Sequence, residues 1–238
     1  PRSTLFPYTT LFRSYLDLVL TGIKRLENLG EELGIDLEWT APGHLTLISN
    51  ENQWRSFEIL VERLQRRCIP AEMMDLATVR KAEPFLNPEG FIGAAFSHEG
   101  HLNPFKFNAG FARAASRMGV KIIHGARVTG FEKTGKHINT VITTKGHFIG
   151  RVVLMAVGAW SGELAALAGT TFPMKFTHAE AVVSESLPPV LHHHIGMTGF
   201  YEAVHGSDRS VTLGIAQHIN GTLVASNAVQ KMEKLDLS

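Results

Sequence analysis

Residues 152–167, VVLMAVGAWSGELAAL, decide the fold of this chain. An apolar run leads to Gly158, and a strongly helix-favouring run follows it. The pattern predicts a buried strand, a tight turn and the start of a helix. In open α/β sheets, ligands bind beyond the carboxyl ends of parallel strands, where glycine lets backbone approach a cofactor and helix N-termini offer unpaired N–H groups. Gly158 therefore marks a candidate ligand-binding edge, with an ordinary α/β turn as the alternative.

Three stretches of the sequence resemble one known family in the same order. The string AVGAWSGELAAL, residues 156–167, is similar to the A-x-G-A-W-S/A segment of the D-amino-acid-oxidase-like FAD-dependent oxidoreductases. Residues 100–132, GHLNPFKFNAGFARAASRMGVKIIHGARVTGFE, and residues 172–189, FPMKFTHAEAVVSESLPP, also resemble that family. Its members include glycine oxidase, sarcosine oxidase and amine or amino-acid dehydrogenase subunits. The resemblance covers roughly residues 15–225, as an ordered set of weak motifs whose joint occurrence is more specific than any one of them.

The resemblance implies a fold class and a cofactor. The fold is expected to be α/β with mixed α+β character, combining a partial FAD/NAD(P)-binding Rossmann-like domain with an antiparallel-sheet substrate domain. In the family, the glycine-containing corner packs its backbone beside the flavin, and the residue at Val128 lies where backbone groups can meet the adenine. An ordinary core valine is the alternative for Val128. The resemblance thus implies FAD, with candidate cofactor-binding residues Val128, Ala156, Gly158, Ala159 and Trp160.

The domain organisation follows from the same resemblance. Residues 4–14, TLFPYTTLFRS, read as a translated sequencing-adapter oligonucleotide, so residues 1–14 are expected to be a non-native arm that packs poorly. Residues 15–170 are expected to form the partial FAD-binding domain, with helical and hairpin scaffold elements, interleaved with the substrate domain. Residues 171–238 are expected to form part of the antiparallel substrate-binding domain. The chain is thus interpreted as a fragment that lacks the N-terminal FAD-binding loop and the C-terminus.

Hydrophobic periodicity and turn residues predict the individual elements. Helices are predicted at residues 15–34, 50–64, 78–83 and 104–119. Strands are predicted as a hairpin at residues 37–49, a strand at 90–96, a parallel strand at 120–123, a meander at 126–149, and later strands at 172–186, 195–204 and 210–216.

Composition excludes several classes of protein. The chain has 238 residues, 44% hydrophobic and 19% charged, which is ordinary globular material. A net charge of +1 without a basic run gives no indication of nucleic-acid binding. No apolar run approaches the ~20 residues that cross a bilayer, so no transmembrane segment is predicted. A single cysteine, Cys68, fits a reducing compartment and a cytoplasmic location, with peripheral membrane association in a complex as the alternative.

The glycine loop that normally anchors FAD is missing from the sequence. No G-x-G-x-x-G occurs in the 238 residues, and this loop usually holds the pyrophosphate. Either the gene product is truncated or the protein never bound FAD, and the adapter-like start favours truncation. The chain as written is therefore expected to bind FAD weakly or not at all, and to be inactive alone.

For the full-length protein, the resemblance implies oxidation of an amine or amino acid by an oxidase or dehydrogenase. Hydride would pass from the C–N carbon to flavin N5, giving an imine that hydrolyses. The implied partners are this small-molecule substrate and subunits that pass electrons onward. Two alternatives stay open: a non-catalytic interaction module that keeps the substrate-domain fold, and another FAD oxidoreductase such as a hydroxylase.

Three residues are candidates for substrate binding. Many family members carry an arginine in a Y-x-R-type stretch, where it pairs with a substrate carboxylate. This chain has Tyr201 and Glu202 in GFYEAVHGSDR, so Glu202 stands at the arginine position and favours a cationic or neutral substrate group. Alternatively, Glu202 faces solvent while Tyr201 faces the pocket. His101, in GHLNP, matches a family position near the domain junction.

No metal site and no catalytic nucleophile are predicted. His192, His193 and His194 are adjacent, so on a strand they point to alternating faces, and a polar loop after two prolines explains them. Neither Ser161 nor Cys68 has His and Asp partners at motif spacing. The sequence identifies no catalytic residue.

Overall fold

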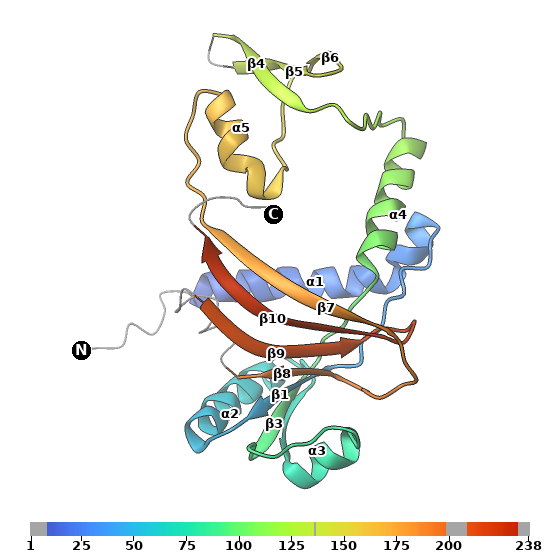
Figure 1. The fold of residues 1–238 in the computed structure, drawn as a ribbon, viewed down its shortest axis with the longest axis vertical. Coiled ribbons are helices and arrows are strands. Elements are labelled where there is room, and N and C mark those ends of the chain that lie inside the picture. Colours follow the sequence, from blue (N-terminus) through green and yellow to red (C-terminus); the bar gives the residue numbers. More distant parts are fainter. Residues whose placement is uncertain (1–8, 136, 199–208, 233–238) are drawn as a thin grey trace, which may run out of the picture.

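The computed structural model describes residues 9–135, 137–198 and 209–232. Figure 1 shows two groups of elements, one built on a large sheet and the other on a small sheet with a short helix. The larger sheet has seven strands in the order β2-β3-β1-β8-β9-β10-β7, and the smaller has three in the order β4-β5-β6. The predicted α/β class with mixed α+β character is confirmed: the large sheet is mixed, and the small sheet is antiparallel.

The elements have the following bounds. The helices are α1 Thr9–Leu33, α2 Glu51–Gln65, α3 Leu76–Ala82, α4 Pro104–Arg117, the 3₁₀ turn η1 Gly158–Trp160 and α5 Ser161–Leu167. The strands of the larger sheet are β1 His44–Ile48, β2 Ala71–Asp75, β3 Gly93–Ser97, β7 Phe176–Ser186, β8 His194–Met197, β9 Arg209–Gln217 and β10 Thr222–Met232. The smaller sheet contains β4 Val128–Thr134, β5 His137–Thr143 and β6 Gly146–Ile149. None of the described helices is long and apolar enough to cross a membrane.

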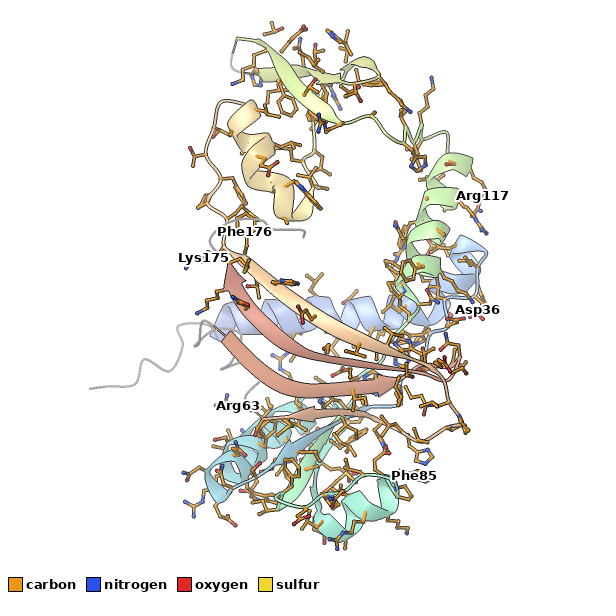
Figure 2. The ribbon with its side chains drawn as sticks, in the orientation of Figure 1. Asp36, Arg63, Phe85, Arg117, Lys175 and Phe176 are labelled. Carbon is orange, nitrogen blue, oxygen red and sulfur yellow. The ribbon has the colours of Figure 1, made fainter. Side chains whose placement is uncertain are left out.

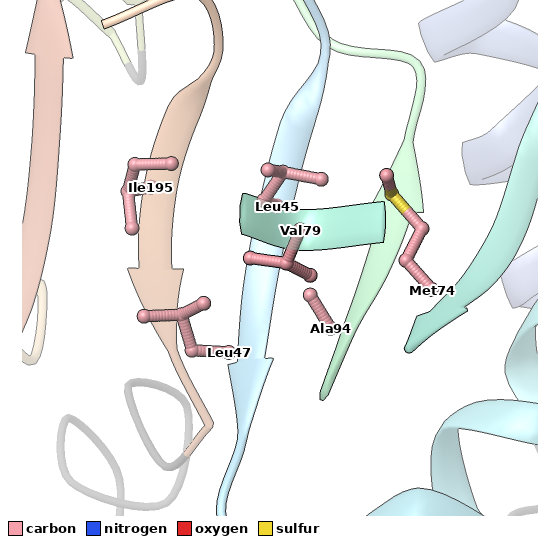
Figure 3. Packing of buried hydrophobic residues seen from close by; sticks show 6 residues of the cluster. All are labelled: Leu45, Leu47, Met74, Val79, Ala94 and Ile195. Carbon is pink, nitrogen blue, oxygen red and sulfur yellow. The ribbon is translucent and has the colours of Figure 1, made fainter. Parts of the chain in front are cut away.

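Strand β1 lies inside the large sheet, between β3 and β8, and is covered on both faces. Its alternating residues face different helices because side chains of a strand point to opposite sides. Leu45 and Leu47 pack with Val79 of α3 on one face, as Figure 3 shows. Ile48 packs with Val61 of α2 on the other face. Strand β1 is therefore buried on both of its faces.

The predicted helix starts are confirmed where the sequence carries a cap. The side chain of Asn50 accepts a hydrogen bond from the backbone N–H of Gln53 at the start of α2. Asn103 does the same for Phe105 and Lys106 at the start of α4. Such caps satisfy N–H groups that have no partner within the helix.

Two predicted parallel strands are wrong. Residues 120–123 and 152–157 carry no strand pairing in the described chain, and the predicted buried strand before Gly158 is exposed: Val152 is 78% and Leu154 is 86% accessible. Apolar composition indicates a tendency to bury, but a strand also needs a neighbour to accept its backbone hydrogen bonds. No described strand pairs with these segments through backbone hydrogen bonds. The turn and the helix that follow do form.

The predicted hairpin at residues 37–49 is also wrong. Thr40 forms an isolated antiparallel bridge with His101 instead of pairing with β1. Strand β1 pairs antiparallel with β3 and parallel with β8. Both of these partners are distant in sequence, and the long-range pairing replaces the local turn at Pro42.

The ends of the chain differ from the prediction in two further places. Helix α1 begins at Thr9, inside the segment set aside as an arm, because extending an existing helix costs little compared with starting one. Strand β10 was not predicted, although Asn220-Gly221 before it is a dipeptide typical of tight hairpins. The predicted strand at 195–204 corresponds to β8 as far as Met197, and its part from residue 199 onward lies outside the described residues.

Two connections join the elements around the small sheet to the rest of the fold. Arg117 is the last residue of α4, and its guanidinium donates to the carbonyl of Leu33 at the end of α1, at 3.1 Å. Lys175 and Phe176 lie where the chain returns into β7 (Figure 2). Between these points the chain forms β4 to β6 and then α5. The elements that carry the candidate cofactor residues are therefore inserted between α4 and β7.

Candidate functional site

A hollow of about 1160 Å³ lies between the start of β4 and the corner that leads into α5. Four of the five candidate cofactor-binding residues line it: Val128, Ala156, Gly158 and Trp160. Ala159 belongs to the same corner but is not among the lining residues. The structure thus brings Val128, from the meander, next to the glycine corner that the sequence singled out.

The backbone at Gly158 is open to an approaching group. Its φ of +56° lies in the left-handed region, and a Cβ built there would meet nothing within 4 Å. The hydroxyl of Ser161 donates to the carbonyl of Gly158 at 2.7 Å and fixes the corner. Trp160 beside it is 45% accessible. A flat group can therefore contact the corner without displacing a side chain.

The lining of the hollow fits part of an FAD molecule. Val128, Ala156 and Leu164 present carbon surface suited to a flat ring, and Arg127 adds a positive charge. The pyrophosphate lacks its usual glycine loop, because the sequence contains no G-x-G-x-x-G. The described residues therefore match the ring contacts of the cofactor better than its phosphate contacts.

A second polar site lies on the large sheet, where β1, β8 and the loop after β3 meet. His44 on β1 lies opposite His194 on β8 in the parallel register. The carboxylate of Glu99 is 3.2 Å from Nδ1 of His44 and 3.3 Å from Nδ1 of His194. Two imidazoles therefore share one carboxylate. We call these three residues the His-Glu-His cluster.

The two imidazoles make Glu99 unusually acidic. Its hydrogen bond with His194, and then the close contact with His44, lower the pKa of Glu99 to about 2, against a smaller opposing effect of burial. Glu99 is thus ionised at all pH values near neutrality.

His101 lies at this cluster and not at the hollow beside Gly158. Its Nδ1 is 2.5 Å from Nε2 of His194, and its Nε2 is 3.4 Å from the hydroxyl of Thr40. Burial, followed by repulsion from His194 and His218, lowers the pKa of His101 to about 4. His101 is therefore neutral near pH 7. Its predicted contact with substrate stays a prediction, as do the roles of Tyr201 and Glu202, which lie outside the described residues.

A buried carboxylate that the sequence did not reveal holds the histidine run. Glu83 is fully buried and accepts hydrogen bonds from the backbone N–H groups of His192 and His193. Its Oε1 is also 2.7 Å from Nδ1 of His193. Only His194 of the run joins the His-Glu-His cluster. Sequence reasoning missed Glu83, Glu99 and His44 because their partners are distant along the chain.

Comparison with known proteins places the chain in a family. The sequence profile described as "DAO: FAD dependent oxidoreductase" matches residues 3–231. The sarcosine oxidase subunit beta of Arthrobacter sp is 33% identical over 194 residues, which is 76% of this chain and 48% of that protein. A D-amino acid dehydrogenase of Rhizorhabdus wittichii is 29% identical over 153 residues, covering 63% of this chain and 37% of that protein. The chain thus spans less than half the length of these curated relatives.

Solved structures share the fold at low sequence identity. The L-proline dehydrogenase from P. horikoshii superposes with a TM-score of 0.75 at 20% identity, over 90% of this chain and 55% of that chain. Glycine oxidase from Geobacillus kaustophilus gives a TM-score of 0.74 at 20% identity, over 95% and 57% of the two chains. An L-alpha-glycerophosphate oxidase from Mycoplasma pneumoniae with FAD bound gives 0.67 at 18% identity, over 84% and 52%. The family match and these folds agree: the chain belongs to the DAO family of FAD-dependent oxidoreductases.

Proposed function

We propose that the full-length protein oxidises the C–N bond of an amine or amino acid with FAD as its cofactor. The observation that carries the proposal is the single hollow shared by Val128 and the Gly158 corner, because the resemblance implies that these segments meet the adenine and the flavin. Relatives named for sarcosine and D-amino acids support this class of substrate.

The residues around the hollow bind and orient. The open backbone at Gly158 allows close approach of a flat ring, and Trp160 covers one side of it with apolar surface. Val128 supplies backbone groups from β4, and Ala156 lets the chain pass close to the ligand because its side chain is small. When bound, the flavin supplies an acceptor for hydride from the C–N carbon at its N5 position. By orienting the cofactor, these residues would set the face on which substrate is oxidised.

Substrate recognition is assigned to the later sheet. Tyr201 and Glu202 follow β8 in the sequence, and we propose that they face the substrate. A carboxylate at Glu202 would repel a substrate carboxylate and attract a cationic amine. Partner subunits for electron transfer fit the name of the sarcosine oxidase relative, which is a beta subunit. The 238-residue chain alone is expected to be inactive because it lacks the usual pyrophosphate loop.

Anaerobic flavin reduction tests the proposed reaction. The open reading frame that contains these residues would be expressed and purified, and its visible flavin spectrum recorded. Sarcosine, glycine and a set of D-amino acids and amines would then be added without oxygen. We expect at least one of them to bleach the flavin band, and an artificial electron acceptor to restore it. Bound flavin that is reduced by NAD(P)H and not by any amine would instead favour a hydroxylase, and absence of bound flavin would favour a non-catalytic module.

A further inference from the structure

We propose that the His-Glu-His cluster, formed by His44, Glu99 and His194, binds a divalent transition-metal ion of the Zn²⁺ class. The sequence predicted no metal site, and that prediction considered only the three adjacent histidines. The structure uses one of them together with a histidine and a carboxylate from other parts of the chain. Imidazole nitrogen and carboxylate oxygen are ligands that Zn²⁺ accepts.

The distances between the ligand atoms suit a small metal ion. Bonds of about 2.0–2.1 Å in a tetrahedral zinc site place neighbouring ligand atoms roughly 3.3 Å apart. Glu99 lies 3.2 Å from Nδ1 of His44 and 3.3 Å from Nδ1 of His194. The ligand atoms of all three residues lie within 4.8 Å of one another. Side-chain rotations can therefore bring them onto one ion.

The geometry at Nδ1 of His44 differs from that of an ordinary hydrogen bond, although an ion-pair contact with Glu99 is close. Nδ1 of His44 is buried, yet it forms no hydrogen bond with any described residue, although Glu99 is close. Buried polar atoms in proteins are almost always satisfied by a protein group, a water or an ion. A metal ion bound to Nδ1 of His44 would satisfy it.

The second ring nitrogen of His194 has a partner of the kind that metal-bound histidines use. With Nδ1 on the ion, Nε2 of His194 carries the proton and donates to Nδ1 of His101, 2.5 Å away. Nε2 of His101 in turn lies 3.4 Å from the hydroxyl of Thr40, which leaves its Nδ1 to face His194. Such outer hydrogen bonds fix the tautomer and orientation of a ligand.

The backbone holds the ligand-bearing segments in place without an ion. The N–H of Gly43 donates to the carbonyl of Glu99 at 3.0 Å. The carbonyl of Gly43 accepts a hydrogen bond from the N–H of His194, also at 3.0 Å. Gly196, two residues after His194, leaves space for the ring of His44: a Cβ there would lie 2.5 Å from Nε2. The site is therefore largely formed in advance of binding.

The site is also reachable from solvent. The side chain of Glu99 is 49% accessible, whereas those of His44 and His194 are 23% and 9% accessible. A hollow of about 530 Å³ next to the cluster is lined by His194, His218 and Thr40. Three protein ligands with an open side leave room for a water as the fourth ligand. The proposal does not depend on FAD binding or on the oxidation of amines.

Metal titration of the purified chain tests the proposal. After treatment with a chelator and its removal, the chain would be titrated with ZnCl₂ by calorimetry, and bound zinc measured by mass spectrometry. We expect one ion per chain and a rise in the melting temperature. Titration with Co²⁺ gives a readout without any substitution, since tetrahedral coordination produces strong visible absorption. Wild-type chain that shows neither stoichiometric zinc nor this absorption would overturn the proposal.

Substitutions then locate the site. His44→Gln and Glu99→Gln should each weaken zinc binding by about 100-fold, and His101→Phe by roughly 10- to 100-fold through the lost outer hydrogen bond. His147→Gln is the control, because His147 is an exposed histidine near a glutamate, Glu132, on the other sheet. Equal zinc binding by wild type and Glu99→Gln, with circular dichroism showing both folded, would refute the assignment.

Discussion

His44 on β1 lies directly opposite His194 on β8, in the parallel pairing that joins two distant segments of the chain at the centre of the large sheet. This pairing places both imidazoles on the carboxylate of Glu99. One register thus produces both the buried sheet centre and the polar cluster at the first residues of these two strands.

Replacing Gly196 tests how closely the two strands pack. In Gly196→Ala, the new Cβ would lie 2.5 Å from the His44 ring, so the ring must move. We expect the free energy of unfolding to fall by about 1–3 kcal/mol, as for other overpacked sites. Gly130→Ala is the matched control, because a Cβ there meets its nearest atom at 3.6 Å. Equal effects of the two substitutions in urea denaturation would contradict the described packing.

Glu83 should stabilise the histidine run. Gln in its place would turn an amide NH₂ toward backbone N–H donors that now meet a carboxylate oxygen. Glu83→Gln is expected to lower the free energy of unfolding by about 1–3 kcal/mol, the usual cost of a buried unsatisfied group. The exposed Glu89 provides a control, since Glu89→Gln should change the free energy of unfolding by less than about 0.5 kcal/mol. Denaturant titrations of both variants make the comparison, and a neutral effect at Glu83 would argue against these bonds.

The sheet centre should be the most sensitive apolar site. Leu45 has no accessible surface and packs with Leu47 and Val79. Leu45→Ala should cost about 2–5 kcal/mol in unfolding free energy through lost transfer energy and a remaining cavity. Leu18 on α1 is 69% accessible, so Leu18→Ala should cost far less. Thermal and denaturant unfolding of the two variants measure both losses of stability. A larger loss in Leu18→Ala than in Leu45→Ala would be incompatible with β1 as the core strand.

The Glu38–Lys106 pair predicts a pH dependence. Its 2.7 Å hydrogen bond, with a second from Asn103, lowers the pKa of Glu38, and the same bond raises the pKa of Lys106. A carboxyl group with a lowered pKa stabilises the fold at pH values above its pKa in the unfolded chain. This stabilisation is lost as the pH falls through its pKa in the folded protein. A lysine with a raised pKa stabilises the fold at pH values below its pKa in the unfolded chain. This stabilisation is lost as the pH rises through its pKa in the folded protein. The pair therefore contributes its full stabilisation at pH values above the pKa of Glu38 in the unfolded chain and below the pKa of Lys106 in the unfolded chain.

NMR titration of the Glu38 carboxyl checks this directly. In Lys106→Gln, we expect the pKa of Glu38 to move up toward its ordinary value, because its first partner loses its charge. Exposed pairs are weakened by salt, so the shift should shrink at high ionic strength. An unchanged Glu38 pKa in the variant would mean that the pair does not form in solution.

The sequence predicted what depends on neighbouring residues. Asn50 and Asn103 identified two helix starts because a capping side chain bonds to N–H groups two or three residues on. The glycine corner was likewise visible, since the positive φ of Gly158 is a local requirement. The family motifs located Val128 and this corner, which the structure brings to one hollow.

Contacts between distant segments could not be predicted in this way. The apolar run before Gly158 looked like a buried parallel strand, but pairing depends on a neighbouring strand that periodicity does not reveal. His44 and Glu99 carried no motif. The β1–β8 register places His44 beside His194, and the hydrogen bond from Gly43 to the carbonyl of Glu99 holds the segment of Glu99 next to them. The expectation of no metal site weighed the adjacent histidines and not distant ones, and it stays a prediction that the metal titration tests.

The FAD affinity of the full-length protein tests the central claim most directly. Gly158→Leu would place a branched side chain at the open corner and strain a positive φ, whereas Gly135→Leu makes the same change at a φ of +63° in the β4–β5 turn, away from the hollow. We predict that Gly158→Leu weakens FAD binding by about tenfold or more, close to 1.4 kcal/mol, while Gly135→Leu binds like wild type. Equal affinity of Gly158→Leu and wild type, with both folded, would contradict the placement of the cofactor at this corner.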